Sequence, residues 1–354
     1  MTAPENPPQA PLPAESRAAV TLHDVAREAG VSLATASRSL NGSTRKVAEE
    51  YRQRVLAAAE RLNYTPNLSA QAVARGSTRT VALLVADIAD PYFSTIASGV
   101  GAAADEAQLL VTMAATERDP ERELELVRTM RGQRPRVMIL ASSRRTDDPL
   151  APALRAELEA FEQTGGRVVV ISTNDLNFRT VLLDNAAGAR DLALALADRG
   201  YRHVAVLAAP EGLVTSEDRL RGFTEGLAAR GIELDPAAVV RTGFTRDGGY
   251  EGMQRLLAMG REIDLVFAVN DVMAVGALSA VRDAGLTPGV DIALAGFDDI
   301  PTVRDVTPPL STVAIPLAEV GRRALAMALD EPAAGSHEPV ATTVVLRAST
   351  PHRH

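Results

Sequence analysis

The chain has 354 residues, a formal net charge of −8, and neither cysteine nor tryptophan. This length is enough for two or three domains with cores of their own, and the lack of cysteine excludes disulfide bonds and thiol catalysis. No apolar run reaches the roughly 18 residues of a membrane-spanning helix. Residues 1–19 lack the basic start and apolar centre of a signal peptide, so we expect a disordered tail on a cytoplasmic protein.

The charge is distributed unevenly along the chain. Residues 20–79 contain nine basic and five acidic residues, a local charge of +4, whereas the chain after residue 79 carries −11. The net charge alone would argue against a nucleic-acid partner. A basic segment joined to an acidic body is nevertheless typical of a DNA-binding protein.

The basic segment reads as a helix-turn-helix over residues 20–66. Thr21 is a good N-cap, and apolar residues recur at helical spacing over 22–29. Gly30 suits a tight turn, and Ser32 can cap a second helix over 33–40. A third helix is predicted over 48–62.

The second helix of such a motif lies in the major groove, and its first residues meet base edges. Arg38 can pair with guanine or a phosphate, while Leu33 and Ala34 can contact thymine methyl groups. The outward surface also includes Thr35 and Ser37. The alternative is an ordinary helical cap with a solvated arginine-rich face.

This segment resembles the headpieces of the LacI/GalR (lac and gal repressor) family. The residues that fit the family pattern are Val20, Thr21, Leu22, Asp24, Val25, Ala26, Ala29, Gly30, Val31, Ser32, Thr35, Ser37, Arg38, Leu40 and Asn41, followed by Leu62, Tyr64, Pro66 and Asn67. Ala36 departs from it, because valine is usual there. The resemblance implies DNA contacts from Thr21, Leu33, Ala34, Thr35, Ser37, Arg38, Asn41, Tyr64, Asn67 and Ala70. By their charge, the candidate phosphate contacts are Arg45, Lys46, Arg52 and Arg54, with a solvated helix face as the alternative.

Residues 67–78 are expected to form a hinge. Asn67 can cap a helix over 68–75 that Gly76 ends, and so short a helix is marginal alone in water. The resemblance implies that two such helices meet in the minor groove, where Val73 occupies the position of the family's leucine wedge. A plain interdomain linker is the alternative.

Beyond residue 79, short apolar runs alternate with helical segments. Such runs suit buried parallel strands, and their number favours two tandem doubly wound lobes, as in periplasmic-binding-protein-like folds. We expect an effector-binding domain over 79–347, followed by a short tail over 348–354. The first lobe is assigned to 79–178 and 312–335, and the second lobe to 179–311 and 336–347.

A ligand of this fold class binds beyond the carboxyl ends of the strands. The resemblance places effector contacts at Tyr92, Phe93, Ser172, Arg219, Phe244, Asn270 and Asp298. Arg219 suits a grip on hydroxyls or a carboxylate, and Asp298 suits two sugar hydroxyls. For Phe93 and Phe244 the alternative is packing in the core, and for Arg219 it is a structural salt bridge. Asp271 is expected to shape its turn.

No cofactor, metal site or catalytic constellation is expected. Gly99, Gly101 and Ala104 match a nucleotide-binding pattern, but they fall inside a predicted helix and not at a strand-to-helix turn. The histidines show no metal spacing.

Together these features predict a homodimeric transcription regulator, most simply a repressor, that binds a near-palindromic operator and responds to a sugar. A purine- or nucleoside-responsive regulator of the same fold is the alternative. A solute-binding protein and an NAD- or sugar-dependent enzyme are more distant ones. The C-terminus shows no leucine heptads, so a dimer is expected and not a tail-linked tetramer.

Overall fold

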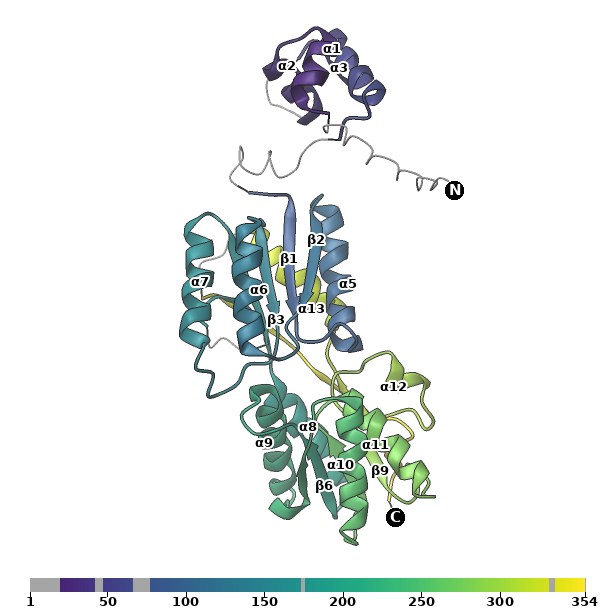
Figure 1. Cartoon of the computed structure of the whole chain (residues 1–354). Coiled ribbons are helices and arrows are strands. Elements are labelled where there is room, and N and C mark those ends of the chain that lie inside the picture. Colours follow the sequence, from purple (N-terminus) through teal and green to yellow (C-terminus); the bar gives the residue numbers. More distant parts are fainter. Residues whose placement is uncertain (1–19, 42–46, 66–76, 173–175, 331–334, 354) are drawn as a thin grey trace, which may run out of the picture. The chain divides into compact units, whose positions relative to one another are not determined.

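The computed structural model describes residues 20–41, 47–65, 77–172, 176–330 and 335–353. The chain divides into two compact units, one up to Ala74 and one from Arg75 onward (Figure 1). We call the described parts of these units the headpiece and the body. The tail over 1–19 and the hinge residues Asn67, Ala70 and Val73 lie outside the described residues, as do Arg45 and Lys46.

The headpiece consists of α1 (Leu22–Ala29), α2 (Leu33–Asn41) and α3 (Glu49–Arg61), which confirms the predicted helix-turn-helix. Thr21 caps α1 reciprocally with Asp24, and Gly30 turns the chain with φ of 62°. Ser32 Oγ accepts a hydrogen bond of 3.1 Å from the amide of Thr35 at the start of α2. Val25, Ala36 and Val55 are fully buried in a core shared by the three helices.

The first lobe of the body is a six-stranded parallel sheet in the order β11-β5-β4-β3-β1-β2. Alternate residues of its central strands face opposite layers of helices (Figure 1). Val81 and Leu83 belong to the core under α5 and α13, whereas Ala82 and Leu84 face α6 and α7. The bounds are β1 Thr80–Val85, β2 Leu110–Ala115, β3 Val137–Ala141, β4 Arg167–Ser172, β5 Arg179–Leu183, β11 His337–Val340, α5 Pro91–Glu106, α6 Pro120–Gly132, α7 Ala151–Gln163 and α13 Leu317–Leu329.

The second lobe is a four-stranded parallel sheet in the order β7-β6-β8-β9. Helices α8 and α9 pack as one pair, and α10 and α11 as another (Figure 1). The bounds are β6 Val204–Ala208, β7 Val239–Arg241, β8 Leu265–Ala268, β9 Ala293–Ala295, α8 Asn185–Asp198, α9 Val214–Ala228, α10 Arg246–Ala258, α11 Asp271–Asp283 and α12 Thr302–Asp305, with a 3-10 turn over Pro236–Ala238.

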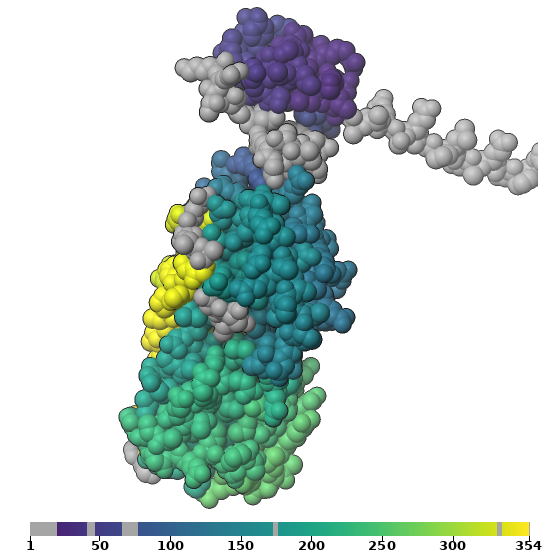
Figure 2. Space-filling view, turned by 90° about the vertical axis from the view of Figure 1, so that its left-hand side faces the viewer, coloured from purple at the N-terminus to yellow at the C-terminus, as the bar shows by residue number. Residues whose placement is uncertain are grey.

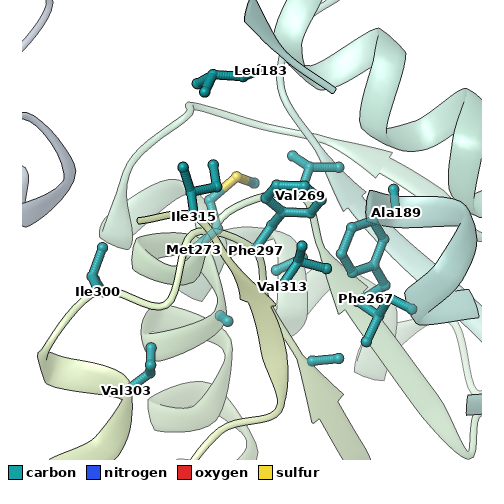
Figure 3. Close-up of a cluster of buried hydrophobic side chains, with 14 of the residues drawn as sticks. Leu183, Ala189, Phe267, Val269, Met273, Phe297, Ile300, Val303, Val313 and Ile315 are labelled. Atoms are coloured by element: carbon teal, nitrogen blue, oxygen red, sulfur yellow. The ribbon is translucent and has the colours of Figure 1, made fainter. Parts of the chain in front are cut away.

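Strands β10 (Thr312–Ala314) and β12 (Thr343–Val345) form an antiparallel pair that belongs to the second lobe. Val313 of β10 lies beside Phe297 and Phe267 in the buried cluster of Figure 3. Single bridges join Ser311 to Ala295 and Ala314 to Asp298.

The chain therefore passes between the lobes near residue 184, at 315–316 and at 341–342. Figure 2 shows the yellow C-terminal residues along one side of the body, beside the teal first lobe and toward the green second lobe.

This path corrects three predictions. The strands β5 and β11 were assigned to the second lobe but pair in the first sheet, and β10 was assigned to the first lobe but pairs in the second. Hydrophobic runs report burial and not the sheet that a strand joins. The expected tail is also wrong for its described residues, because Ser349 and Thr350 are fully buried and Ser349 donates to the Leu294 carbonyl at 2.6 Å.

One glycine of the nucleotide-like pattern, Gly99, has a packing role. The pattern lies in the middle of α5, as predicted, and a Cβ on Gly99 would stand 1.9 Å from the carbonyl oxygen of Ala318 on α13. A Cβ on Gly321 of α13 would likewise stand 2.2 Å from the carbonyl oxygen of Ile96. The two helices thus approach at a distance that only glycine permits.

Two alanine substitutions on α5 test this contact. Gly99→Ala should lower the free energy of unfolding by about 2 kcal/mol, because the new methyl group forces the helices apart. Gly101→Ala should raise it by roughly 0.5–1 kcal/mol, because nothing lies within 4 Å of its Cβ and alanine is the better helix former. Urea denaturation measures both, and equal effects would refute the close-packing argument.

Candidate functional site

The outward side of α2 carries part of the predicted DNA-contacting set. Leu33, Ala34 and Arg38 are exposed, and Leu33 is 39% exposed although it is a large apolar residue. Thr35 and Ser37 are half-buried, and the hydroxyl of Thr35 lies 2.8 Å from that of Ser32. The exposed residues are those suited to base edges, while Thr35 also helps to begin the helix.

The structure also describes three other predicted contacts of the headpiece. The side chain of Thr21 is engaged with Asp24 in the cap of α1, and Tyr64 is half-buried against the headpiece core. Asn41 is the last residue of α2. Arg54, suggested as a phosphate contact, instead donates to the Ala29 carbonyl at 2.6 Å and so closes the end of α1.

A narrow cleft lies between the two lobes of the body. It is lined by Tyr92, Phe93, Ser172, Arg219, Phe244, Asn270 and Asp298, together with Asp90, Ala141, Ser142, Ser143, Ile171 and Thr215. The structure therefore brings together all seven residues predicted from the sequence. Most follow the carboxyl ends of strands, where a doubly wound sheet places its ligands. The free volume is only about 30 Å³, room for a few water molecules.

Arg219 lies at the centre of the cleft and is 2% exposed. Its Nε donates to Asn185 Oδ1 at 2.9 Å, Nη1 to the Val269 carbonyl at 2.7 Å, and Nη2 to Asp298 Oδ1 at 2.7 Å. The guanidinium also stacks 3.9 Å from the centre of the Phe297 ring. The salt-bridge alternative is thus present in the structure, and it leaves only part of the guanidinium for a ligand.

Two residues of the cleft have backbone conformations that residues other than glycine rarely adopt. Ser172 has φ of 125° and Asp298 has φ of 122°. Such strain persists where the surrounding structure enforces it, and it concentrates at functional sites. Burial raises the pKa of Asp298 because the charged form loses its hydration, and the Arg219 guanidinium opposes this rise.

Asn270 and Asp271 are neighbours in the chain but have different roles. Asn270 Oδ1 caps α11 by accepting from the Met273 amide at 3.0 Å, which leaves its amide nitrogen as the available donor. Asp271 accepts from the Ile300 amide at 2.9 Å and from the Thr312 hydroxyl at 2.7 Å. Asp271 therefore has a structural role, but its carboxylate holds residues 29 and 41 positions along the chain and not its own turn, as was expected.

Several residues of the site were not predicted from the sequence. Asn185 lies two residues after the end of β5, and Ser142 and Ser143 follow β3, so the same strand-end rule could have found all three. Thr215 has no such signal, because it lies within the first turn of α9.

Contacts between residues 143–146 and 212–215 hold the two lobes together beside the cleft. The Ser143 hydroxyl donates to Thr215 Oγ1 at 2.7 Å, and the Val214 amide donates to the Arg144 carbonyl at 2.9 Å. The Thr146 amide donates to the Gly212 carbonyl, also at 2.9 Å. The structure therefore represents a closed arrangement of the lobes.

Within the described ranges, no helix is long and apolar enough to cross a membrane. The same ranges contain no cluster of His, Cys, Asp and Glu suited to hold a metal ion.

Comparisons with known proteins cover both units of the chain. The family of bacterial regulatory proteins of the lacI type matches residues 21–67, and a periplasmic-binding-protein-like domain matches residues 193–350. The HTH-type transcriptional repressor CytR of Escherichia coli (strain K12) is 34% identical over 316 residues, which are 88% of this chain and 90% of CytR.

Two solved structures are similar over nearly their whole length. The transcriptional regulator CelR in complex with cellobiose is 30% identical, with a TM-score of 0.67, and the match covers 93% of this chain and 99% of CelR. The lac repressor dimer bound to operator and the anti-inducer ONPF is 25% identical, with a TM-score of 0.80 and coverage of 94% and 100%.

The buried carboxyl of Asp271 predicts a pH dependence of stability. Burial raises its pKa to about 7, above the ordinary value of 3.8, so its favourable contribution is full below pH 3.8 and is lost as the pH rises through 7. The free energy of unfolding should fall between about pH 4 and pH 7, and Asp271→Asn should reduce that fall by roughly 3 kcal/mol. The exposed Asp105→Asn is the control in urea titrations, and identical slopes for the two variants would contradict the argument.

Proposed function

Because the chain belongs to the LacI family of bacterial regulatory proteins, we propose that it represses transcription from a near-palindromic operator and that a sugar controls its affinity for DNA. The observation that carries the proposal is the convergence of the seven predicted residues in one cleft, in a chain that also carries a helix-turn-helix headpiece. The role is regulatory and not catalytic, in the cytoplasm of a bacterium.

The DNA-binding half of the proposal rests on α2. Its exposed residues Leu33, Ala34 and Arg38 supply apolar contacts and one bidentate donor to the major groove. Two copies of the chain present two such helices, and a two-fold dimer requires a two-fold operator. The lac repressor dimer, bound to operator in its own structure, supports this arrangement.

The effector half rests on the chemistry of the cleft. Phe244 offers an aromatic face, Asn270 and Arg219 offer donors, and Asp298 offers an acceptor, which is the mixture that a sugar ring requires. The cellobiose complex of CelR favours a sugar over a nucleoside. About 30 Å³ does not admit a ring, so the lobes must open at the contacts between residues 143–146 and 212–215 before the effector enters.

The effector binds one arrangement of the lobes more tightly than the other, and in this way it changes the affinity of the protein for the operator. A coupling free energy of about 1–3 kcal/mol would alter operator affinity roughly 5- to 150-fold.

Removal of the Arg38 side chain tests the DNA interface. We expect Arg38→Ala to weaken binding to a palindromic duplex, selected by the protein from a random library, by about tenfold or more, because one base or phosphate contact is lost. Fluorescence anisotropy at fixed salt measures the change. Arg128→Ala removes an exposed arginine of the body and should leave affinity unchanged. Failure of the wild-type protein to select any palindrome would overturn the proposal.

Removal of the Phe244 ring tests the effector site. A thermal-shift screen of sugars and nucleosides first identifies the sugar that binds the wild-type protein best. Phe244→Ala should retain operator affinity in the absence of effector but lose most of its response to that sugar. Tyr250→Ala, which removes an aromatic ring outside the cleft, should respond as the wild type does. A stronger shift with nucleosides than with any sugar would replace the sugar by a nucleoside in this proposal.

A further inference from the structure

The amino-terminal edge of the first sheet carries a group of arginines. The segments that lead into β1, β2, β3 and β4 cover residues 77–80, 107–110, 133–137 and 164–168, and they contain Arg79, Arg134, Arg136 and Arg167 but no acidic residue. The strands β4, β3 and β1 are neighbours, and adjacent strands lie about 4.8 Å apart, so these positions are close together. The edge is basic although the chain after residue 79 carries a net charge of −11.

Three of these arginines are exposed, and we call them the basic edge: Arg79, Arg134 and Arg136. Within the part of the chain that the structure describes, none of the three forms an ion pair, and Arg79 donates to the neutral side chain of Gln108 at 3.2 Å. By contrast, the exposed Arg128 of α6 pairs with Glu157 at 3.0 Å. The guanidinium groups of the basic edge can therefore bind an anion from outside the chain.

Arg134 has a backbone conformation that glycine normally adopts. The helix α6 ends at Gly132, Gln133 caps it, and Arg134 follows with φ of 52°. The left-handed residue after a helix is usually glycine, because a Cβ is unfavourable there. Unfavourable conformations of this kind concentrate at functional sites. An arginine at this position therefore points to a role of its side chain outside the fold.

The basic edge lies where the described part of the body begins. The amide and the hydroxyl of Thr78 donate to the Arg134 carbonyl at 2.8 and 3.0 Å, and the Arg136 amide donates to the Thr80 carbonyl at 2.9 Å. The loop that carries these arginines is thus bonded to the residues that directly follow 66–76, which join the body to the headpiece. A duplex held by the headpiece is tethered to this edge, and the tether raises its effective concentration there.

From these observations we infer that the basic edge binds the phosphate backbone of the operator, as a second DNA contact outside the headpiece. Arginine pairs with phosphate oxygens through two parallel hydrogen bonds, and such contacts add affinity without reading sequence. Each neutralised phosphate releases counterions, so the contact makes binding more dependent on salt. The inference rests on the proposed function, because it assumes that the headpiece binds an operator.

A double substitution in the full-length protein tests the inference. Arg134→Gln with Arg136→Gln should weaken binding at physiological salt about tenfold, equally on the selected operator and on a random duplex, because phosphate contacts are lost and base contacts stay. The slope of log affinity against log salt concentration should become less steep by about 2 or more, since each phosphate contact contributes about 0.9 and a dimer carries two basic edges. Fluorescence anisotropy over a series of salt concentrations measures both.

The matched control removes two other exposed arginines. Arg190→Gln with Arg255→Gln, in α8 and α10 of the second lobe, makes the same change in net charge. It should leave the affinity and the salt slope unchanged, because the contact depends on where the charges lie.

Arg134→Gly separates contact with DNA from a role in folding. Glycine suits the left-handed conformation, so this variant should unfold at an unchanged or higher urea concentration. Its operator affinity should nevertheless fall about threefold or more, because the guanidinium is lost. A side chain that served only the fold would lower the urea midpoint and leave DNA binding unchanged, and that result would contradict the inference.

The outcomes distinguish the two proposals. A wild-type protein that selects a palindrome, with a double variant whose salt slope equals that of the control, would overturn the second contact while operator binding stands. Failure of the wild-type protein to select any palindrome would overturn both. Should the double variant not fold, Arg134→Gly alone decides the matter.

Discussion

The guanidinium of Arg219 joins three chain segments that enter the cleft from different parts of the second lobe. It bonds Asn185 at the start of α8, the Val269 carbonyl beyond β8, and Asp298 beyond β9. Each of these groups is buried, so loss of the guanidinium would leave a carboxylate without its cation. The positions of these three segments relative to one another depend on this one charged centre.

The same network lies next to a passage between the lobes. The backbone carbonyl of Asp298 accepts from the Ile315 amide, and the Asp298 amide donates to the Val313 carbonyl. The helix α13 begins two residues after Ile315. A ligand that exchanges bonds with Asp298 therefore acts on the strand that leads into the first lobe. Because Asp298 has a strained φ and a raised pKa, its closed geometry is not the one that an isolated chain would prefer.

The sequence predicted local structure and the composition of the cleft better than it predicted connectivity. Thr21, Gly30 and Ser32 act through their own turns, so their roles were visible in a few letters. The strand-end rule and the family resemblance together found residues such as Asn270 and Asp298. The sheet that β5 or β11 joins depends on partners far along the chain, as do the partners of Arg219 and Arg54. Alternating hydrophobicity contains no information about either.

The close contact of α5 with α13 has a mechanical consequence. The helix α5 begins with Tyr92 and Phe93 in the cleft, and α13 begins directly after the 315–316 passage. With Gly99 and Gly321 pressed against the opposing backbones, neither helix can slide along or roll over the other without steric overlap. The two helices must therefore rotate together as one rigid unit. A movement of residues 315–316 would then rotate Tyr92 and Phe93 through the same angle.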